Sequence, residues 1–532
     1  MKRRHFLHQS GLAATGLLLP AGFLASCRPT QAGSSTDVTE TTVATLQEWM
    51  QTGKASAAQI TQAFLDRIKK LDRSGPLLNS VIELNPDALS IARERDEERK
   101  QGKVRGPLHG IPILIKDNID TGDQMMTTAG SLALEGNKAG QDAFIIAKLR
   151  LSGAVILGKT NLSEFANFRS TRSSSGWSSR GGQTRNPYIL DRNPCGSSSG
   201  SGTAVAASLC AIAIGSETNG SIACPSSING IVGIKPTVGL WSRSGIIPIS
   251  QTQDTAGPMA RTVRDAALLL GACTGEDTAD KRTEESKGKA LTDYTPFLKA
   301  DSLKGKRIGI DKDALKGNEE AAALFTKAME IMKAQGATFV EIDFNSSFKN
   351  MGKGEHTVLT YEFKDGLNRY LATSKAKVKS LTEVIAFNKA NKDRVMPYFK
   401  QELLVESDAL KGLDTKEYQD ALANILRITR TAIDEAHEQH QLDALLSPGD
   451  GPSWCTDWVN GDAFAGNSYY WPAAIAGYPH ITVPMGFVHG LPVGLHFIGQ
   501  AWTEGSLISL AYAYEQASSE RKAPEFKTTL GS

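Results

Sequence analysis

Short, mainly apolar runs that alternate with helical stretches restrict most strongly how this chain of 532 residues can fold. Runs of this length and composition are typical of strands buried inside a sheet. They lie at residues 111–115, 154–158, 211–215, 307–310, 338–342, 480–485 and 494–498. Because helical stretches lie between them, the pattern predicts an α/β protein with helices on both faces of a sheet.

Helices are predicted from apolar spacing and from capping signals. Ser56 and Gln59 form a capping box ahead of apolar residues spaced three and four apart, which marks the start of a helix. Further helices are expected at about residues 86–101, 141–151 and 202–210.

Residues 315–440 are predicted to be mostly helical, and we expect them to cover the sheet or to form a helical insertion. No internal repeat and no clean linker follows residue 40, so a single large domain is expected over residues 40–527. The apolar fraction of 40% and the charged fraction of 22% suit a soluble globular domain.

Charge, histidines and cysteines exclude several classes of protein. The formal net charge is only +2, so a general electrostatic binder of nucleic acid is not expected. The cysteines include no C-x-x-C pair, and the histidines include no H-E-x-x-H motif. His437 and His440 form an H-x-x-H on a predicted helix, but no third ligand is near in sequence. We interpret the two as a solvated helix face, and no metal site is predicted.

Residues 1–26 are typical of an export signal peptide. Residues 2–4 are basic, and the apolar run at residues 11–25 is shorter than the roughly 20 residues that a membrane-spanning helix needs. Residues 3–7 (R-R-H-F-L) resemble the twin-arginine motif, whose export route carries folded proteins. The general export route is the alternative.

Residues 24–27 (L-A-S-C) resemble a bacterial lipobox, in which the cysteine becomes the lipidated first residue of the mature protein. Residues 27–39 would then form the lipid anchor, Cys27, and a polar tether. These motifs predict a protein anchored by lipid in the bacterial cell envelope, on its periplasmic or outer face, with no other membrane contact. An ordinary signal peptide with an incidental cysteine is the alternative. With Cys27 lipidated, an odd number of cysteines remains, so they cannot all be paired.

Residues 109–118 (H-G-I-P-I-L-I-K-D-N) place Lys116 at the inner end of an apolar strand. Burial disfavours the charged form of a lysine, which lowers its pKa and makes it usable as a base. A lysine that simply emerges where the strand meets water is the alternative.

Two segments rich in Ser and Gly suit acyl transfer. Residues 193–202 (N-P-C-G-S-S-S-G-S-G) lead directly into a helix, which argues against a flexible linker, and they lack the lysine of a phosphate-binding loop. Residues 215–225 (G-S-E-T-N-G-S-I-A-C-P) follow a strand and can present a serine hydroxyl beside backbone N–H donors. A nucleophile with an oxyanion hole needs that arrangement, and an ordinary strand-to-loop turn is the alternative.

The three segments, in this order, resemble the amidase signature family, which includes peptide amidases, fatty acid amide hydrolases and the amidotransferase A subunit that acts on glutamyl-tRNA. The resemblance extends over about residues 40–525. It also includes R-I-x-x-L-D (67–72), G-K-T-N-L-S-E-F (158–165), G-I-K-P-T-V-G (233–239), D-T-A-G-P-M-A-R-T-V (254–263) and the C-terminal stretch 476–499. The family implies a central mixed, twisted β-sheet covered by helices on both faces.

The resemblance also implies a Ser–cis-Ser–Lys triad that hydrolyses amides without a metal or organic cofactor. The family lysine falls on Lys116, the relay serine after a cis peptide bond on Ser197, and the nucleophile on Ser221. Neutral Lys116 would accept a proton through Ser197 while Ser221 attacks the amide carbonyl. Water would then hydrolyse the acyl-enzyme, giving an acid together with ammonia or an amine.

Backbone N–H groups are expected to form the oxyanion hole, at Thr218, Asn219, Gly220 and Ser221. Ser198 and Asp254 are the expected supporting side chains. The sequence departs from the commonest family pattern at Asn219, Ala223 and Ser199. Asn219 and Ala223, with the pair Cys224-Pro225, are more similar to the peptide-amidase branch.

Two other functions remain possible on the sequence alone. Residues 196–200 also satisfy G-x-S-x-G, so Ser198 could be the nucleophile of an α/β-hydrolase-type serine esterase, with His480 as a candidate base. A non-catalytic envelope lipoprotein that binds a ligand without turnover is the second.

The sequence leaves the amide substrate open. The expected partner is a small-molecule or peptide amide, with no nucleic acid, and no oligomeric state is indicated. Residues 315–440 and 454–459 (W-C-T-D-W-V) are expected to line the pocket.

Overall fold

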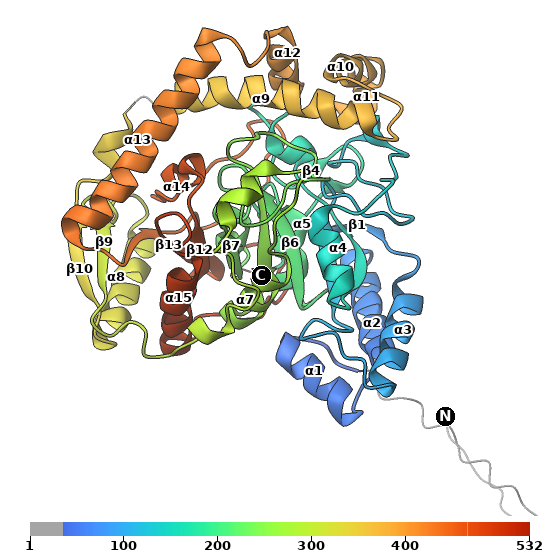
Figure 1. Ribbon diagram of the computed structural model, residues 1–532, viewed down its shortest axis with the longest axis horizontal. Coiled ribbons are helices and arrows are strands. Elements are labelled where there is room, and N and C mark those ends of the chain that lie inside the picture. The colour runs from blue at the N-terminus through green and yellow to red at the C-terminus, as the bar shows by residue number, and fades with distance from the viewer. Residues whose placement is uncertain (1–35, 350, 465, 532) are drawn as a thin grey trace, which may run out of the picture. The chain divides into compact units, whose positions relative to one another are not determined.

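The computed structural model describes residues 36–531, except residues 350 and 465. The predicted signal peptide, Cys27 and the tether as far as residue 35 lie outside the described residues. Within the described range, no helix is long and apolar enough to cross a membrane. The described chain is built around an 11-stranded sheet flanked by helices, as the alternating pattern predicts (Figure 1).

The sheet is mixed. Two groups of parallel strands, β3-β2-β6 and β11-β9-β10, lie on either side of a run of antiparallel pairs, and the edge strand β1 pairs antiparallel with β3. Across the sheet the order is β1 (Val81–Leu84), β3 (Val155–Thr160), β2 (Pro112–Lys116), β6 (Ile212–Glu217), β8 (Thr255–Ala260), β7 (Val232–Lys235), β12 (His480–Val488), β13 (Leu491–Ile498), β11 (Ala444–Pro448), β9 (Arg307–Asp311) and β10 (Thr338–Ile342). All seven predicted runs overlap strands. A small separate sheet joins β4 (Trp177–Ser178) and β5 (Gly182–Gln183).

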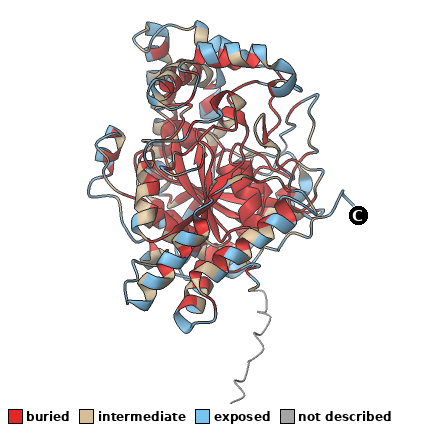
Figure 2. Ribbon diagram, turned by 90° about the vertical axis from the view of Figure 1, so that its right-hand side faces the viewer, coloured by how far each residue is buried: buried red, intermediate tan, exposed pale blue. Residues whose placement is uncertain are grey.

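Helices flank this sheet or cover the loops around it, and Figure 2 shows buried strands behind helices whose outer faces are exposed. They are α1 (Val43–Thr52), α2 (Ala57–Arg67), α3 (Ala88–Lys100), α4 (Phe144–Leu151), α5 (Ser199–Ala206), α6 (Ala223–Ile228), α7 (Val263–Ala272), α8 (Glu319–Ala334), α9 (Met351–Thr373), α10 (Leu381–Ala390), α11 (Lys392–Val395), α12 (Glu402–Ala409), α13 (Lys416–His440), α14 (Trp471–Ala476) and α15 (Glu504–Ser518). The capping box is confirmed at α2, where Ser56 and Gln59 bond each other's backbone N–H groups.

The segment 315–440 is mostly helical, as predicted, and it has two roles. α8 packs on the strands β10, β11 and β12. α9, α10 and α12 instead share an apolar cluster with loop residues that include Phe168 and Ile249, so they cover loops rather than the sheet.

The interpretation of His437 as a solvated residue is wrong. His437 lies on the buried face of α13, four residues after Ile433, and only 6% of it is exposed. Its Nδ1 lies 2.9 Å from the Ile433 carbonyl oxygen, so a local backbone contact satisfies one ring nitrogen.

The topology explains how two distant segments come together. β2 and β6 are parallel neighbours, with Ile113 opposite Ile212 and Ile115 opposite Ile214. Because parallel strands end at the same edge of a sheet, Lys116 at the end of β2 lies beside the loop that follows β6.

Candidate active site

Lys116 is fully buried, and four oxygen atoms surround its amine. Nζ lies 2.8 Å from Ser197 Oγ, 2.9 Å from Ser198 Oγ, and 3.0 Å from both the carbonyl oxygen and Oγ of Ser216. Burial lowers the pKa of Lys116 to about 7, although the negative charges of Asp254 and Glu217 act to raise it. A neutral amine in this position can accept a proton from a serine hydroxyl near neutral pH.

Ser197 lies in the turn just before α5. The Gly196–Ser197 peptide bond is cis, which confirms the expectation from the family resemblance. A Cβ atom at position 196 would lie 2.3 Å from Ser163 Oγ, so any larger residue there would force that side chain to move. The backbone N–H of Ser163 also donates to the Ser197 carbonyl at 3.1 Å, which holds the turn in place.

Ser198 connects the start of α5 to β6. Its hydroxyl donates to the Ser216 carbonyl at 3.0 Å and accepts from the Ser216 N–H at 3.2 Å. Together with its contact to Lys116, these bonds place Ser198 beside the predicted triad.

Ser221 lies on the wall of a cavity and is 8% exposed. Within the described residues its hydroxyl makes no hydrogen bond, so it is free to meet a substrate. The structure therefore contains the contact between Lys116 and Ser197 but no hydrogen bond between the hydroxyls of Ser197 and Ser221. The two loops are joined by a backbone bond, in which the Ser198 N–H donates to the Ser221 carbonyl at 3.1 Å.

Glu217, which the sequence analysis missed, organises the loop after β6. Its Oε2 accepts the backbone N–H groups of Ile222 at 2.7 Å and Ala223 at 2.9 Å. Within the described residues, the backbone N–H groups of residues 218–221, which precede Ile222, donate no hydrogen bond to another part of the protein. They are the groups predicted for the oxyanion hole, and they remain available for a ligand oxygen.

Glu217 also pairs with His480, whose Nε2 lies 2.8 Å from Oε1. Burial acts to raise the pKa of Glu217, but His480 and the other groups around it lower that pKa to about 2. His480 thus partners Glu217, whereas the Ser198 hydroxyl contacts Lys116 and Ser216. The arrangement does not supply the histidine-activated Ser198 of an α/β-hydrolase.

Asp254 joins the loop after β6 to the segment before β8. The Thr218 hydroxyl donates to Oδ1 at 2.6 Å, and the N–H groups of Ile249 and Ser250 donate to Oδ2 at 2.8 and 2.9 Å. Burial raises the pKa of Asp254 to about 6, against the effect of these hydrogen bonds. These contacts place Asp254 beside the loop predicted to form the oxyanion hole.

The cavity beside Ser221 has a volume of about 270 Å³. It is lined by Ala166, Asn167, Phe168, Gly196, Thr218, Asn219, Gly220, Ser221, Cys224, Ile249, Leu359, Phe464 and Tyr470. No ionisable acid or base is among these residues apart from the phenol of Tyr470. Leu359 belongs to α9, as predicted for the helical segment. The prediction for residues 454–459 is wrong, since the C-terminal wall comes from Phe464 and Tyr470.

Asn219 links the predicted oxyanion loop to α9. Its side-chain amide donates to Glu355 Oε1 at 2.7 Å, and Gln253 Nε2 donates to the same oxygen at 3.1 Å. Burial raises the pKa of Glu355. The asparagine that departs from the commonest family pattern thus joins the loop to the helix that contributes Leu359.

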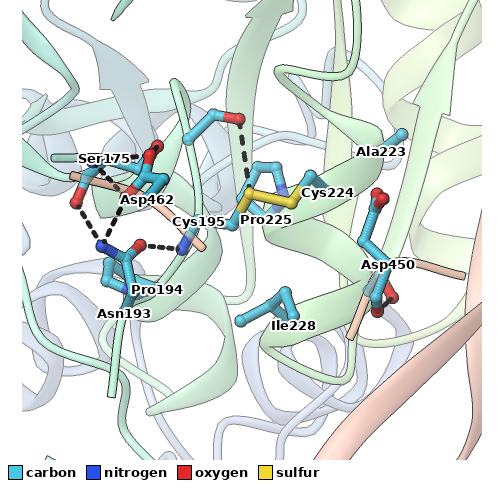
Figure 3. The surroundings of a disulfide bond; sticks show 12 residues. Ser175, Asn193, Pro194, Cys195, Ala223, Cys224, Pro225, Ile228, Asp450 and Asp462 are labelled. Atoms are coloured by element: carbon cyan, nitrogen blue, oxygen red, sulfur yellow. Dashed lines mark hydrogen bonds between the residues drawn. A yellow bond between two sulfur atoms is a disulfide. The ribbon is translucent and has the colours of Figure 1, made fainter. Parts of the chain in front are cut away.

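A disulfide bond joins Cys195 to Cys224 (Figure 3), and Cys224 lines the same cavity. The Cα atoms of the two cysteines are 5.9 Å apart. Cys210, Cys273 and Cys455 are free, which agrees with the expectation that the cysteines cannot all be paired. Sequence spacing gave no reason to select this pair.

Comparisons with known proteins agree on one family. The family model described as Amidase matches residues 59–508. A protein of Arabidopsis thaliana named a probable amidase is 39% identical over 507 residues, which cover 93% of each chain. The chain is similar to the native peptide amidase of Stenotrophomonas maltophilia, with a TM-score of 0.87 and 51% identity over 92% of this chain and 99% of the other. It is equally similar to the peptide amidase PAM in complex with the competitive inhibitor chymostatin, with a TM-score of 0.89 and 52% identity over the same shares.

Proposed function

The chain belongs to the amidase family and hydrolyses amides, and from this premise we propose that its substrate is the terminal amide of a peptide or peptide-like compound. The products are the peptide acid and ammonia. Two features support this substrate class: the 52% identity to a peptide amidase and a cavity whose walls are largely apolar and uncharged. Such walls suit a neutral amide better than a charged group, which would lose its hydration without gaining a partner.

We propose Lys116, Ser197 and Ser221 as the catalytic residues. As the bond from Ser221 Oγ to the amide carbon forms, the hydroxyl proton of Ser221 passes to Ser197, and Ser197 passes its own proton to neutral Lys116. The N–H groups of residues 218–221 hold the oxyanion. When the C–N bond breaks, the proton returns through Ser197 to the nitrogen, which leaves as ammonia.

Water then completes the reaction by the same relay. A water molecule gives up a proton through Ser197 to Lys116 and forms a bond to the acyl carbon. The ester bond to Ser221 breaks, and Ser221 recovers its proton. The observation that carries this proposal is the fully buried amine of Lys116, 2.8 Å from Ser197 Oγ and beside the loop that bears the free Ser221 hydroxyl.

The test is an assay of ammonia release from a set of N-blocked dipeptide amides. We expect turnover of peptide amides with an uncharged terminal residue, and none by the Ser221→Ala variant. Hydrolysis of simple aryl or aliphatic amides with no turnover of any peptide amide would contradict the substrate class. Equal activity of Ser221→Ala and the wild type would contradict the assignment of the nucleophile.

We also propose that the protein is exported and lipid-anchored at Cys27. The signal-peptide, twin-arginine and lipobox motifs of the sequence support this location. The Cys195–Cys224 disulfide supports it independently, because disulfides persist in oxidising compartments such as the bacterial periplasm.

A further inference from the structure

The disulfide joins the two loops that carry the proposed relay and nucleophile. Cys195 is two residues before Ser197, and Cys224 is three residues after Ser221. Both cysteines are buried, with 1% and 3% of their surfaces exposed. In Figure 3 the sulfur–sulfur bond spans the gap between the segment of Pro194 and Cys195 and the start of α6.

Each end of the bond is fixed by its own set of contacts. On one side, the Cys195 N–H donates to Asn193 Oδ1 at 2.8 Å, and the side-chain amide of Asn193 donates to Asp462 at 3.1 Å (Figure 3). On the other side, the Cys224 N–H donates to the Gly220 carbonyl at 2.8 Å, within the proposed oxyanion loop. The disulfide is therefore a short covalent connection between two anchored pieces of backbone.

A few hydrogen bonds also connect these loops near the reacting groups, including the two between the Ser198 hydroxyl and Ser216 at the end of β6. The Ser198 N–H donates to the Ser221 carbonyl, and the Asn229 side chain donates to the Pro194 carbonyl at 2.9 Å. The hydroxyls of Ser197 and Ser221 do not bond each other, so their separation depends on how the backbones are held.

We propose that the Cys195–Cys224 disulfide is a positioning element that limits the separation of the Ser197 and Ser221 loops, so that the two hydroxyls can come within reach of each other for proton transfer. The inference rests on the proposed triad, because it concerns the relay between those two serines. Displacement of a catalytic group by about 1 Å can reduce a rate by about 100-fold. The cross-link limits such displacement at a point two residues from the relay serine.

This role has a specific kinetic consequence. Ser197 must return a proton to the leaving nitrogen of an amide, because an unprotonated amine is a poor leaving group. The p-nitrophenolate of an ester leaves without that proton. Loss of the cross-link should therefore reduce amide turnover more than ester turnover, whereas a smaller fraction of folded enzyme would reduce both equally.

The experiment compares Cys195→Ser/Cys224→Ser with the wild type on the amide that the wild type hydrolyses fastest and on the p-nitrophenyl ester of the same acyl group. Cys455→Ser, at an exposed free cysteine, is the matched control. We expect kcat for the amide to fall about 10- to 100-fold, and the amide-to-ester ratio of kcat to fall at least about tenfold. The control should match the wild type on both substrates.

A second pair, Cys195→Ala/Cys224→Val, keeps the site apolar beside Ile228 and Trp454 but also lacks the bond. It should show the same fall in the ratio. An unchanged ratio in a folded double variant would overturn the proposal. Failure of both pairs to fold while Cys455→Ser folds would also overturn it, since the bond would then serve the fold and not the relay. Absence of amide turnover by the wild type would instead contradict the proposed function.

Discussion

Lys116 becomes a usable base because the sequence places it at the end of a strand that is buried on both faces. Pro112 to Lys116 are all buried, and desolvation brings the lysine pKa to about 7. Two carboxylates act in the opposite direction, since the charges of Asp254 and Glu217 raise that pKa. The burial effect is larger, so both the neutral and the charged amine are accessible near neutral pH.

The first prediction concerns this titration. Only neutral Lys116 can accept a proton, so kcat should rise about tenfold per pH unit below pH 7 and level off above about pH 8. The variant Asp254→Asn removes a charge that raises the lysine pKa, so its midpoint should move to lower pH. A pH–rate profile for both enzymes measures the two midpoints. A flat wild-type profile between about pH 5 and pH 9, with chemistry limiting the rate, would contradict a lysine base.

Substitutions of the three serines of the site distinguish Ser221 from Ser198 as the nucleophile. Ser221→Ala should abolish amide hydrolysis, and Ser197→Ala and Lys116→Ala should each reduce kcat by at least about 1,000-fold, because the three groups act as a unit. Ser198→Ala should reduce kcat less, since its hydroxyl supports Lys116 and Ser216. Steady-state kinetics on one peptide amide, with circular dichroism to check folding, measures these effects. A variant series in which Ser198→Ala alone is inactive would favour the esterase mechanism.

At the scale of elements, the strands that position the site could be predicted from sequence, and several of their neighbours could not. β2 and β6 are mainly apolar runs, with Pro112 only at the first position of β2 and Gly215 in the second half of β6, and both predictions lie within two residues of the observed bounds. β8 lies between β6 and β7 in the sheet but contains Gly257 and Pro258, residues that normally argue against a central strand. It is a strand because β6 and β7 pair with it on either side, and the sequence of β8 alone does not show that pairing.

The contacts that complete the site come from distant elements, and for that reason the sequence could not predict them. Glu217 ends the observed strand β6, two residues beyond the predicted run at 211–215, and its role depends on His480, which is 263 residues away. The pairing of Cys195 with Cys224 depends on how the loops before α5 and α6 meet. In contrast, the contact between Lys116 and Ser197 was predictable, because the family resemblance covers both segments.

A prediction at this scale concerns the cavity walls. α9 contributes Leu359, and the segment between β11 and α14 contributes Phe464. Leu359→Ala and Phe464→Ala remove apolar surface from the wall, so each should raise KM for a peptide amide about 3- to 30-fold, with a smaller change in kcat. Leu315→Ala, at a residue that is 50% exposed and outside the cavity, is the matched control. Equal KM values for all three variants and the wild type would show that the substrate lies elsewhere.

At the scale of the whole molecule, the site forms at the carboxyl ends of β2 and β6 from segments spread over most of the described chain. β2 supplies Lys116, the turn before α5 supplies Ser197, and α9 and the segment before α14 close the cavity. The disulfide and the Asn219–Glu355 bond fasten these segments to one another at the site itself. Catalytic geometry therefore depends on local cross-connections as well as on the sheet.

The last prediction concerns the location of the whole molecule. Removal of residues 1–26 takes away three cations and no anion from a chain of formal charge +2, so electrostatic attraction to anionic lipid would be weak. Stable membrane binding would then depend on acyl chains at Cys27, each buried CH₂ contributing about 0.8 kcal/mol. In a bacterial host that processes lipoproteins, the wild type should fractionate with membranes, and Cys27→Ser should be soluble or remain unprocessed. The same substitution at Cys455 should leave fractionation unchanged. A soluble wild-type protein cleaved at a bond other than Ser26–Cys27 would contradict the lipid anchor, and it would leave the amidase activity unaffected because the tether precedes the described fold.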